Sequence, residues 1–383
     1  MSSLSDILGQ PRAVEQLTRY LTSDRRHHAM LFVGPEGVGR RTAAEALAQT
    51  LLCPNSDGPD IGPLVAVEET PDPPAPCGEC EDCRLFLAGS HPDYHPVYKE
   101  LARYHSDAQV RSRVMQDLGI PVIRQFLLAP SSQAPTRNRG KVFVVREAQL
   151  MSVPAQNAML KTLEEPPEGV TIILLALRPE LMLPTTVSRC AMVRFGPLPA
   201  QVIEERLIAD GVDPEQASFW ARFTEGSLGR AMKLSGGELY ELKQTLLPAL
   251  AEVPQGGDGE LAETLAKMAD ELAEGIVAEV KQAEGASLSK SLATRQASGT
   301  MLKLIASLYV DAMHVGSGAQ HDLVHADQPM SVEHVAQRFE PSQLAGLLGQ
   351  LSRFEQMLWQ NVNPKLVWDN VVIACSTPRE GDF

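Results

Sequence analysis

Residues 34–42 have the composition of a loop that binds phosphate. The segment reads Gly-Pro-Glu-Gly-Val-Gly-Arg-Arg-Thr. In loops of this kind the backbone N–H groups and the N-terminus of the following helix together bind anionic oxygens. The candidate nucleotide-binding residues here are Gly34, Gly37, Gly39, Arg40, Arg41 and Thr42.

The charged positions of this loop differ from those of a hydrolytic site. A working loop has Lys after the last glycine, to reach the β- and γ-phosphates, and then Ser or Thr to hold Mg²⁺. Here these positions are Arg40 and Arg41, and Thr42 follows one place late. Arg is a planar fork and not a compact ammonium, so the exchange is not conservative. The pattern predicts a phosphate-loop scaffold that does not hydrolyse ATP.

A second metal-binding position is also altered. Phosphate-loop ATPases place an acidic pair after a buried strand, with Asp on Mg²⁺ and Glu near the attacking water. After the segment 141–145, which we expect to be a buried strand, this chain has Arg146 and then Glu147. A guanidinium only donates hydrogen bonds, so Arg146 cannot be a ligand of Mg²⁺. Glu147 remains a candidate residue of the nucleotide site, and we expect ATP binding to be weak or absent.

Four cysteines have the spacing of a metal site. Cys53, Cys77, Cys80 and Cys83 form the pattern C-x23-C-x2-C-x2-C. Four thiolates that converge after one long loop predict tetrahedral Zn²⁺, and an all-sulfur shell makes that zinc structural. Disulfides are unlikely in a reducing compartment, and an iron–sulfur cluster lacks the usual Cys-Pro. Unliganded thiols remain an alternative.

The composition is that of a globular protein without a membrane segment. The chain has 383 residues, of which 44% are hydrophobic and 21% charged. No apolar run approaches the roughly 18 residues that a membrane span needs. A net charge of −14 argues against strong binding to nucleic acid by this chain alone. The N-terminus has no signal-peptide pattern, so we expect a cytoplasmic protein.

Alternating strands and helices must position these residues. Apolar runs predict buried strands at 29–33, 141–145, 171–176 and 192–195. Residues 43–52 favour a helix directly after the glycine-rich loop, which is the context that phosphate binding requires. The acidic, proline-rich segment 54–76 predicts a solvated excursion, and His91-Pro92-Asp93 predicts a turn.

Several strings of the sequence resemble the AAA+ subunits of bacterial clamp loaders, which load the sliding clamp of DNA polymerase III. They are the loop 34–42, the four cysteines, His91-Pro92-Asp93, Asn157 to Pro167, and Ser188-Arg189-Cys190. The resemblance is dense over residues 1–235 and thin afterwards. It implies an α/β AAA+ P-loop NTPase-like domain, with a parallel sheet flanked by helices and an inserted zinc module.

The resemblance also implies the domain organisation. The AAA+ domain would cover residues 1–197, with the zinc module at 53–83, and a helical lid would cover 198–240. Three short helical segments between 200 and 235 suit such a lid. Residues 241–383 would form an all-α collar for oligomerisation. Their leucine-rich helical stripes favour a packing interface over a cofactor site.

Two arginines acquire roles from the resemblance. Arg189 matches the arginine finger that reaches the nucleotide of a neighbouring subunit, where it stabilises developing phosphoryl charge. The alternative for Arg189 is a local structural salt bridge. Arg230, in the string 226–230, matches the second sensor at the start of a lid helix. The first sensor falls near Leu177, which is apolar and cannot orient a water.

The altered positions 40, 41, 146 and 177 imply the fixed, non-hydrolysing subunit of such a complex. This stator would help ATP-driven loading of the clamp onto primed DNA during replication. Its partners would be gamma/tau- and delta-type subunits, the sliding clamp and primer-template DNA, with no membrane. It would have no ATPase activity of its own, although it would belong to the DNA polymerase, a nucleotidyltransferase. The alternatives are an active gamma/tau-like ATPase and a zinc-dependent nucleic-acid-binding module, and the acidic charge disfavours the latter.

Overall fold

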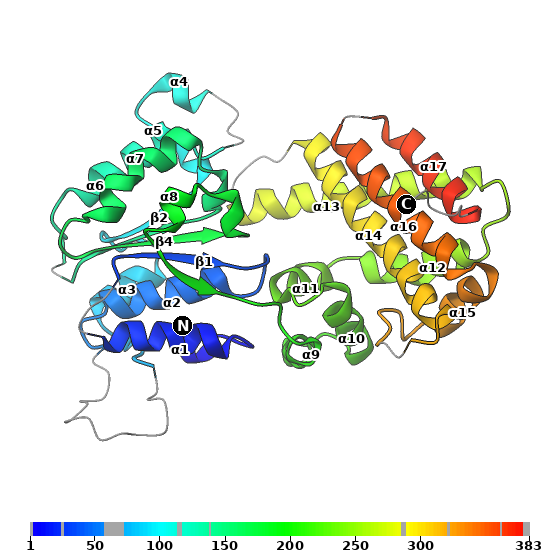
Figure 1. Cartoon of the computed structure of the whole chain (residues 1–383), viewed down its shortest axis with the longest axis horizontal. Coiled ribbons are helices and arrows are strands. Elements are labelled where there is room, and N and C mark those ends of the chain that lie inside the picture. Colours follow the sequence, from blue (N-terminus) through cyan, green and yellow to red (C-terminus); the bar gives the residue numbers. More distant parts are fainter. Residues whose placement is uncertain are drawn as a thin grey trace. The chain divides into compact units, whose positions relative to one another are not determined.

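The computed structural model describes residues 3–23, 27–56, 73–112, 117–137, 139–284, 289–319, 322–360 and 362–377. The chain forms two compact units (Figure 1): Met1–Val202 with Gly226–Gly229, and Ile203–Glu225 with Arg230–Phe383. No described helix combines the length and the apolar character that a membrane span requires. The predicted excursion 54–76 lies mostly outside the described residues.

A parallel sheet of five strands forms the centre of the first unit, in the order β2-β3-β4-β1-β5. The strands are β1 (Ala29–Val33), β2 (Tyr94–Val97), β3 (Lys141–Val145), β4 (Val170–Ala176) and β5 (Ala191–Arg194). In the register of the sheet, Leu31 lies beside Leu174 on one side and Met192 on the other. Every residue of β1 and β3 is buried, as expected for parallel strands covered on both faces.

Helices cover both faces of the sheet (Figure 1). One layer contains α1 (Pro11–Thr22), α2 (Arg40–Leu52) and α3 (Glu81–Leu87), and the other contains α5 (Ile120–Ile123), α7 (Val153–Glu164) and α8 (Pro184–Val187). Short helices α4 (Ala108–Arg111) and α6 (Ala129–Ser131) complete this unit, together with short helical segments at Leu4–Asp6, Lys99–Tyr104, Arg124–Leu128, Ala148–Leu150 and Pro179–Leu181. Met159 and Leu163 of α7 belong to the same buried hydrophobic cluster as Leu31, Phe143 and Leu174 of the sheet.

The four strands predicted from apolar runs are confirmed, with shifts of one residue at β4 and β5. The edge strand β2 was missed, because Tyr-His-Pro-Val contains no apolar run. A proline is tolerated there, since an edge strand pairs on one side only. The helix after the loop begins at Arg40 and not at residue 43, because Gly39 caps it in the left-handed conformation at φ 96°.

The regular elements described in the second unit are helices. They are α9 (Ala200–Ala209), α10 (Pro214–Phe223), α11 (Leu228–Ser235), α12 (Leu239–Ala251), α13 (Gly259–Glu284), α14 (Lys290–Gly316), α15 (Pro329–Arg338), α16 (Pro341–Trp359) and α17 (Pro364–Ser376), of which α9 and α11 begin in residues of the first unit. The long helix α14 packs against α13, α15 and α16, and α13 packs against α17. Trp220, Tyr309 and Trp368 are fully buried.

Candidate functional site

The phosphate loop lies between β1 and α2, at the carboxyl edge of the sheet. Gly34 has a φ of 154°, and a Cβ there would lie 2.3 Å from the carbonyl oxygen of Phe195. This close approach of two backbone segments excludes a side chain. The N-terminus of α2 has no side-chain cap, so its first N–H groups remain donors for an anion. These features are compatible with the phosphate loop expected from the sequence.

Two contacts fix this loop from outside the motif. The side-chain amide of Gln10 donates to the carbonyl oxygens of Val38 (3.2 Å) and Gly196 (2.7 Å), and it accepts from the N–H of Gly196 (3.1 Å). The N–H of Gly229 donates to the carbonyl oxygen of Gly37 at 2.9 Å. Gln10 is 5% exposed. The loop is thus held by residues far from it in sequence.

The guanidinium groups of Arg41 and Arg146 converge on one carboxylate. Arg41 Nε donates to Glu45 Oε1 at 2.7 Å, and Arg146 Nη2 lies 3.6 Å from the same oxygen. The guanidinium of Arg146 also lies 5.1 Å from the centre of the Tyr98 ring. Glu45 was not among the residues predicted for this site, although its i,i+4 spacing from Arg41 is a usable signal. The two positive charges beside the loop are thus offset in part by one carboxylate of the same chain.

The remaining predicted nucleotide-site residues differ in their surroundings. Burial lowers the pKa of Arg40, and Glu36 partly offsets this effect. Thr42 is exposed on the first turn of α2. Glu147 has a φ of 48°, which is uncommon for a residue with a side chain, and lies 3.5 Å from Lys99. Leu177 is 38% exposed directly after β4. Arg230, in contrast, belongs to the second unit.

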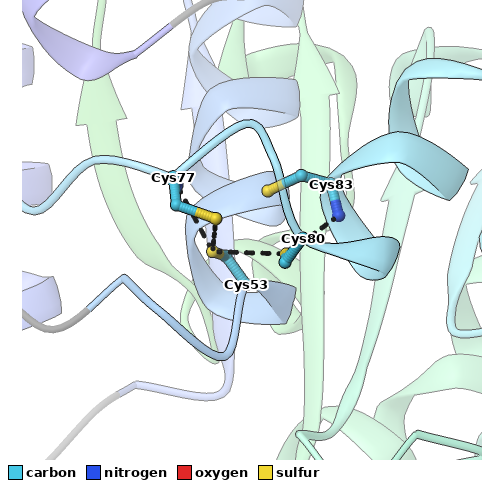
Figure 2. A group of neighbouring side chains, drawn as sticks. All are labelled: Cys53, Cys77, Cys80 and Cys83. Carbon is cyan, nitrogen blue, oxygen red and sulfur yellow. Dashed lines mark hydrogen bonds between the residues drawn. The ribbon is translucent and has the colours of Figure 1, made fainter.

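The four predicted cysteine ligands come together. Cys53 ends α2, Cys80 caps α3, and Figure 2 shows the four side chains gathered around one point. Their sulfur atoms all lie within 4.8 Å of one another, with Cys53 Sγ 3.6 Å from Cys77 Sγ and 3.9 Å from Cys80 Sγ. Sulfurs of a tetrahedral site with Zn–S bonds of about 2.3 Å are about 3.8 Å apart. The cluster therefore has the dimensions of a four-thiolate metal site.

The thiols of this cluster have unequal acidities. Burial raises the pKa of Cys83 to about 12 and also raises that of Cys53. Hydrogen bonds from the backbone N–H groups of Cys80 and Glu79 lower the pKa of Cys77 to about 6. Four thiolates at these separations repel one another, so their joint ionisation requires a bound cation.

The turn at His91-Pro92-Asp93 supports the cysteine cluster from one side. The predicted turn is present at residues 92–93, and the buried carboxylate of Asp93 accepts from the backbone N–H groups of Thr136 and Arg137, both at 2.8 Å. Arg137 Nε in turn donates to Asp82 Oδ1 at 2.7 Å. Because Asp82 lies between Cys80 and Cys83, this network ties the cysteine segment to the sheet.

Arg189 lies between α8 and β5, at the amino edge of the sheet. Its Nε donates to Glu164 Oε1 at 2.6 Å, and its Nη2 pairs with the same oxygen. Its Nη1 donates to the carbonyl oxygen of Thr185 at 2.8 Å. The side chain of Arg189 is 31% exposed and that of Glu164 is 49% exposed. The local salt bridge considered from sequence is thus present.

Comparison with protein families identifies the chain. A family model described as DNA polymerase III, delta subunit matches residues 9–199, and one described as DNA polymerase III, delta subunit, C terminal matches residues 270–376. The chain belongs to the delta-prime/tau family of DNA polymerase III clamp-loader subunits. The two matches include the loop, the cysteine cluster and Arg189 in one region and helices α14 to α17 in the other.

Curated relatives carry names from the same clamp-loader family. The delta-prime subunit of Escherichia coli K12 is 28% identical over 346 residues, covering 90% of this chain and 86% of the relative. The Bacillus subtilis 168 delta-prime subunit is 29% identical over 244 residues, or 64% of each chain. The tau subunit of E. coli K12 is 32% identical over 241 residues, covering 61% of this chain and only 32% of tau.

Solved structures give a weaker likeness to this clamp-loader subunit. A gamma-subunit-related protein of DNA polymerase III from Thermotoga maritima covers 96% of the chain, and the chain covers all of it, at 17% identity and a TM-score of 0.41. The RuvB branch-migration motor of the same organism gives a TM-score of 0.38 at 12% identity, covering 88% of this chain and 90% of RuvB. Both scores are too low for a functional inference. The AAA+ fold expected from the sequence is borne out by the parallel strand order and the family matches.

Proposed function

We propose that this protein is the non-hydrolysing stator subunit of a DNA polymerase III clamp loader. The shared carboxylate of Glu45 carries this proposal, because it binds the guanidinium groups of both Arg41 and Arg146. Phosphoryl transfer needs Mg²⁺ that bridges the β- and γ-oxygens of ATP. With a guanidinium at each position that would hold the metal, the loop keeps its shape without the means to hydrolyse.

In this role the protein helps gamma/tau- and delta-type subunits to load the sliding clamp onto primed DNA in the cytoplasm. The names of the delta-prime and tau relatives support these partners. DNA is contacted through the assembled complex, in keeping with the net charge of −14 of this chain.

We propose the three-part domain division of the sequence for this subunit, with an AAA+ domain at 1–197, a lid at 198–240 and a collar at 241–383. The degenerate nucleotide site then comprises the loop residues together with Glu147, and Arg230 keeps the second-sensor role that the resemblance implies. Weak, Mg²⁺-independent binding of phosphate or nucleotide is the most that the loop supports, since its N–H donors remain.

A structural Zn²⁺ held by Cys53, Cys77, Cys80 and Cys83 is part of this proposal. The sulfur separations fit a tetrahedral shell, and all four positions are filled by protein. Such a metal has no open position for a catalytic water. Its role is to close the loop between the end of α2 and the start of α3.

We assign Arg189 to the ATP site of a neighbouring subunit, as an arginine finger in trans. The test is Arg189→Ala in a loader reconstituted with the other subunits from the same source. We expect normal assembly, a partial fall in clamp- and DNA-stimulated ATPase, and a larger fall in clamp loading. Impaired folding or assembly with unchanged ATPase per complex would leave Arg189 only a structural role.

A further inference from the structure

The guanidinium of Arg189 is held by its own subunit from two elements. Glu164 is the last residue of α7, and its Oε1 accepts a hydrogen bond from Arg189 Nε at 2.6 Å and also pairs with Arg189 Nη2. The carbonyl oxygen of Thr185 in α8 accepts a hydrogen bond from Arg189 Nη1 at 2.8 Å. A guanidinium has five N–H groups, so three are engaged here and two remain for an acceptor outside the subunit.

The position of Glu164 is unfavourable for the helix that carries it. The C-terminus of a helix has a partial negative charge, which favours Lys or Arg and disfavours a carboxylate. Glu164 nevertheless ends α7, and Glu165 follows as its cap. A second carboxylate at this helix end adds like charge. Helix stability therefore does not explain Glu164, whereas its contact with Arg189 does.

The end of α7 is itself well fixed. His28 Nε2 contacts the carbonyl oxygen of Leu163 at 2.6 Å, and Leu163 is buried in the core. Pro166 and Pro167 follow and prevent the helix from continuing. Glu164 is thus a carboxylate at a defined place, while its side chain stays half exposed at 49%.

We propose that Glu164 is the positioning residue for the arginine finger. The inference rests on the proposed function of Arg189 in trans. A flexible Arg loses considerable rotamer freedom when it binds a phosphate, and a side chain that is already oriented loses less. Glu164 and the Thr185 carbonyl hold the inner side of the guanidinium, and the remaining N–H groups donate to phosphoryl charge on the neighbouring subunit.

The experiment compares Glu164→Ala, Glu164→Gln and the matched control Glu165→Ala in the reconstituted clamp loader. Glu165 is exposed one residue away and lies within ion-pair distance of no basic side chain among the described residues. The quantity measured is the ATPase rate that Arg189 contributes, with clamp and primed DNA present. For the wild type and for each variant it is the rate with Arg189 minus the rate of the same protein carrying Arg189→Ala. We expect Glu164→Ala to lower this contribution about two- to fivefold, as for a half-exposed ion pair.

The KM for ATP should stay near the wild-type value, since the proposed role of Glu164 is to orient Arg189 and not to bind the nucleotide. Glu164→Gln keeps an acceptor oxygen and should recover part of the rate, and Glu165→Ala should retain all of it. Assembly measured by size-exclusion chromatography and thermal melting should be unchanged for all three variants.

A double-mutant cycle makes the test decisive. If Glu164 acts through Arg189, Glu164→Ala has no further effect in the Arg189→Ala background. An equal loss in both backgrounds would overturn the positioning role, as would a rise in rate, which would mean that Glu164 restrains the finger. No effect of Glu164→Ala alongside a clear effect of Arg189→Ala would overturn this inference and leave the proposed function intact. No effect of Arg189→Ala would refute the finger itself.

Discussion

Arg146 Nη2, at the end of β3, lies 3.6 Å from Glu45 Oε1 on the helix that follows the phosphate loop. In a hydrolytic relative of this fold, an acidic residue and Mg²⁺ would occupy the space beside that helix. In this protein the guanidinium of Arg146 lies there and pairs with the carboxylate of Glu45. Arg41 adds a second cation to the same oxygen.

The isolated chain should therefore have no ATPase activity above background in a Mg²⁺-dependent phosphate-release assay. The double variant Arg40→Lys with Arg41→Thr should also be inactive, because Arg146 and Leu177 still lack the groups that bind metal and orient water. Steady turnover by the wild-type chain that disappears in Arg40→Ala would contradict this prediction.

Removal of the shared carboxylate should strengthen anion binding at the loop. In Glu45→Ala the guanidinium groups of Arg41 and Arg146 lose their common partner, so we expect pyrophosphate to bind about fivefold more tightly at low salt, as for a partly exposed pair. Isothermal titration calorimetry without Mg²⁺ measures this affinity. Glu15→Ala is the control, because Glu15 pairs with Arg19 on α1. An unchanged affinity in Glu45→Ala would show that Glu45 does not weaken anion binding by pairing with these two guanidinium groups.

Protein purified without chelator should contain about one zinc per chain, as expected for one tetrahedral site. Cys77→Ala should lose most of this metal and loosen the segment before α3, while the sheet core stays folded. Cys190→Ala is the matched control and should keep the metal, because Cys190 lies outside the cluster. Elemental analysis together with circular dichroism measures both effects. Fully folded wild-type protein without metal would rule the site out.

The buried pair Lys243 and Asp327 should be critical for the stability of the second unit. Lys243 has no exposed side-chain surface, and Asp327 Oδ2 also accepts from Tyr240 (2.9 Å) and Gln244 (3.0 Å). Lys243→Met leaves a buried carboxylate without its cation, which typically costs about 3–5 kcal/mol. Lys290→Met removes an exposed pair with Glu274 and should cost less than about 1 kcal/mol.

Urea denaturation followed by tryptophan fluorescence measures these changes in the free energy of unfolding. All three tryptophans of the chain, Trp220, Trp359 and Trp368, belong to the second unit, so their signal reports that unit selectively. Equal losses in Lys243→Met and Lys290→Met would contradict a special role for the buried pair.

The stability of the second unit should fall as the pH is lowered from about 6.5, the ordinary pKa of histidine. Burial and then the nearby Lys243 lower the pKa of His325 to about 3, and Asp327 offsets part of this effect. Between pH 6.5 and 3 the unfolded chain binds a proton that the folded chain does not, so stability decreases by up to about 1.4 kcal/mol per pH unit. The effect is absent above pH 7.

Denaturation at several values between pH 5 and 7.5 measures this slope, above the range in which Asp327 titrates. The slope of the unfolding free energy against pH is proportional to the number of protons taken up on unfolding. His325→Gln should lower this number by about one at the acidic end of the range. His27→Gln, at an exposed position of the first unit, should leave it unchanged. The same slope in wild type and His325→Gln would show that another group is responsible.

Local spacing was sufficient to predict the loop and the cysteine ligands. Glycine positions 34, 37 and 39 depend on backbone geometry within a few residues, and three of the four thiols lie on one short segment. The buried strands β1 and β3 were equally predictable, because strands covered on both faces consist of continuous apolar residues. The arginines at positions 41 and 146, where a hydrolytic site would have residues that bind Mg²⁺, could also be identified from the sequence alone.

Only the tertiary structure decided what those residues contact. Gln10 reaches the loop across 28 positions of sequence, Asp93 reaches Arg137 across 44, and Glu164 reaches Arg189 across 25. Each is one polar residue whose partner is chosen by how strands and helices pack, and a single polar residue has no periodic pattern. The same reason explains the missed edge strand β2, whose conformation is imposed by pairing with β3 and not by its own side chains.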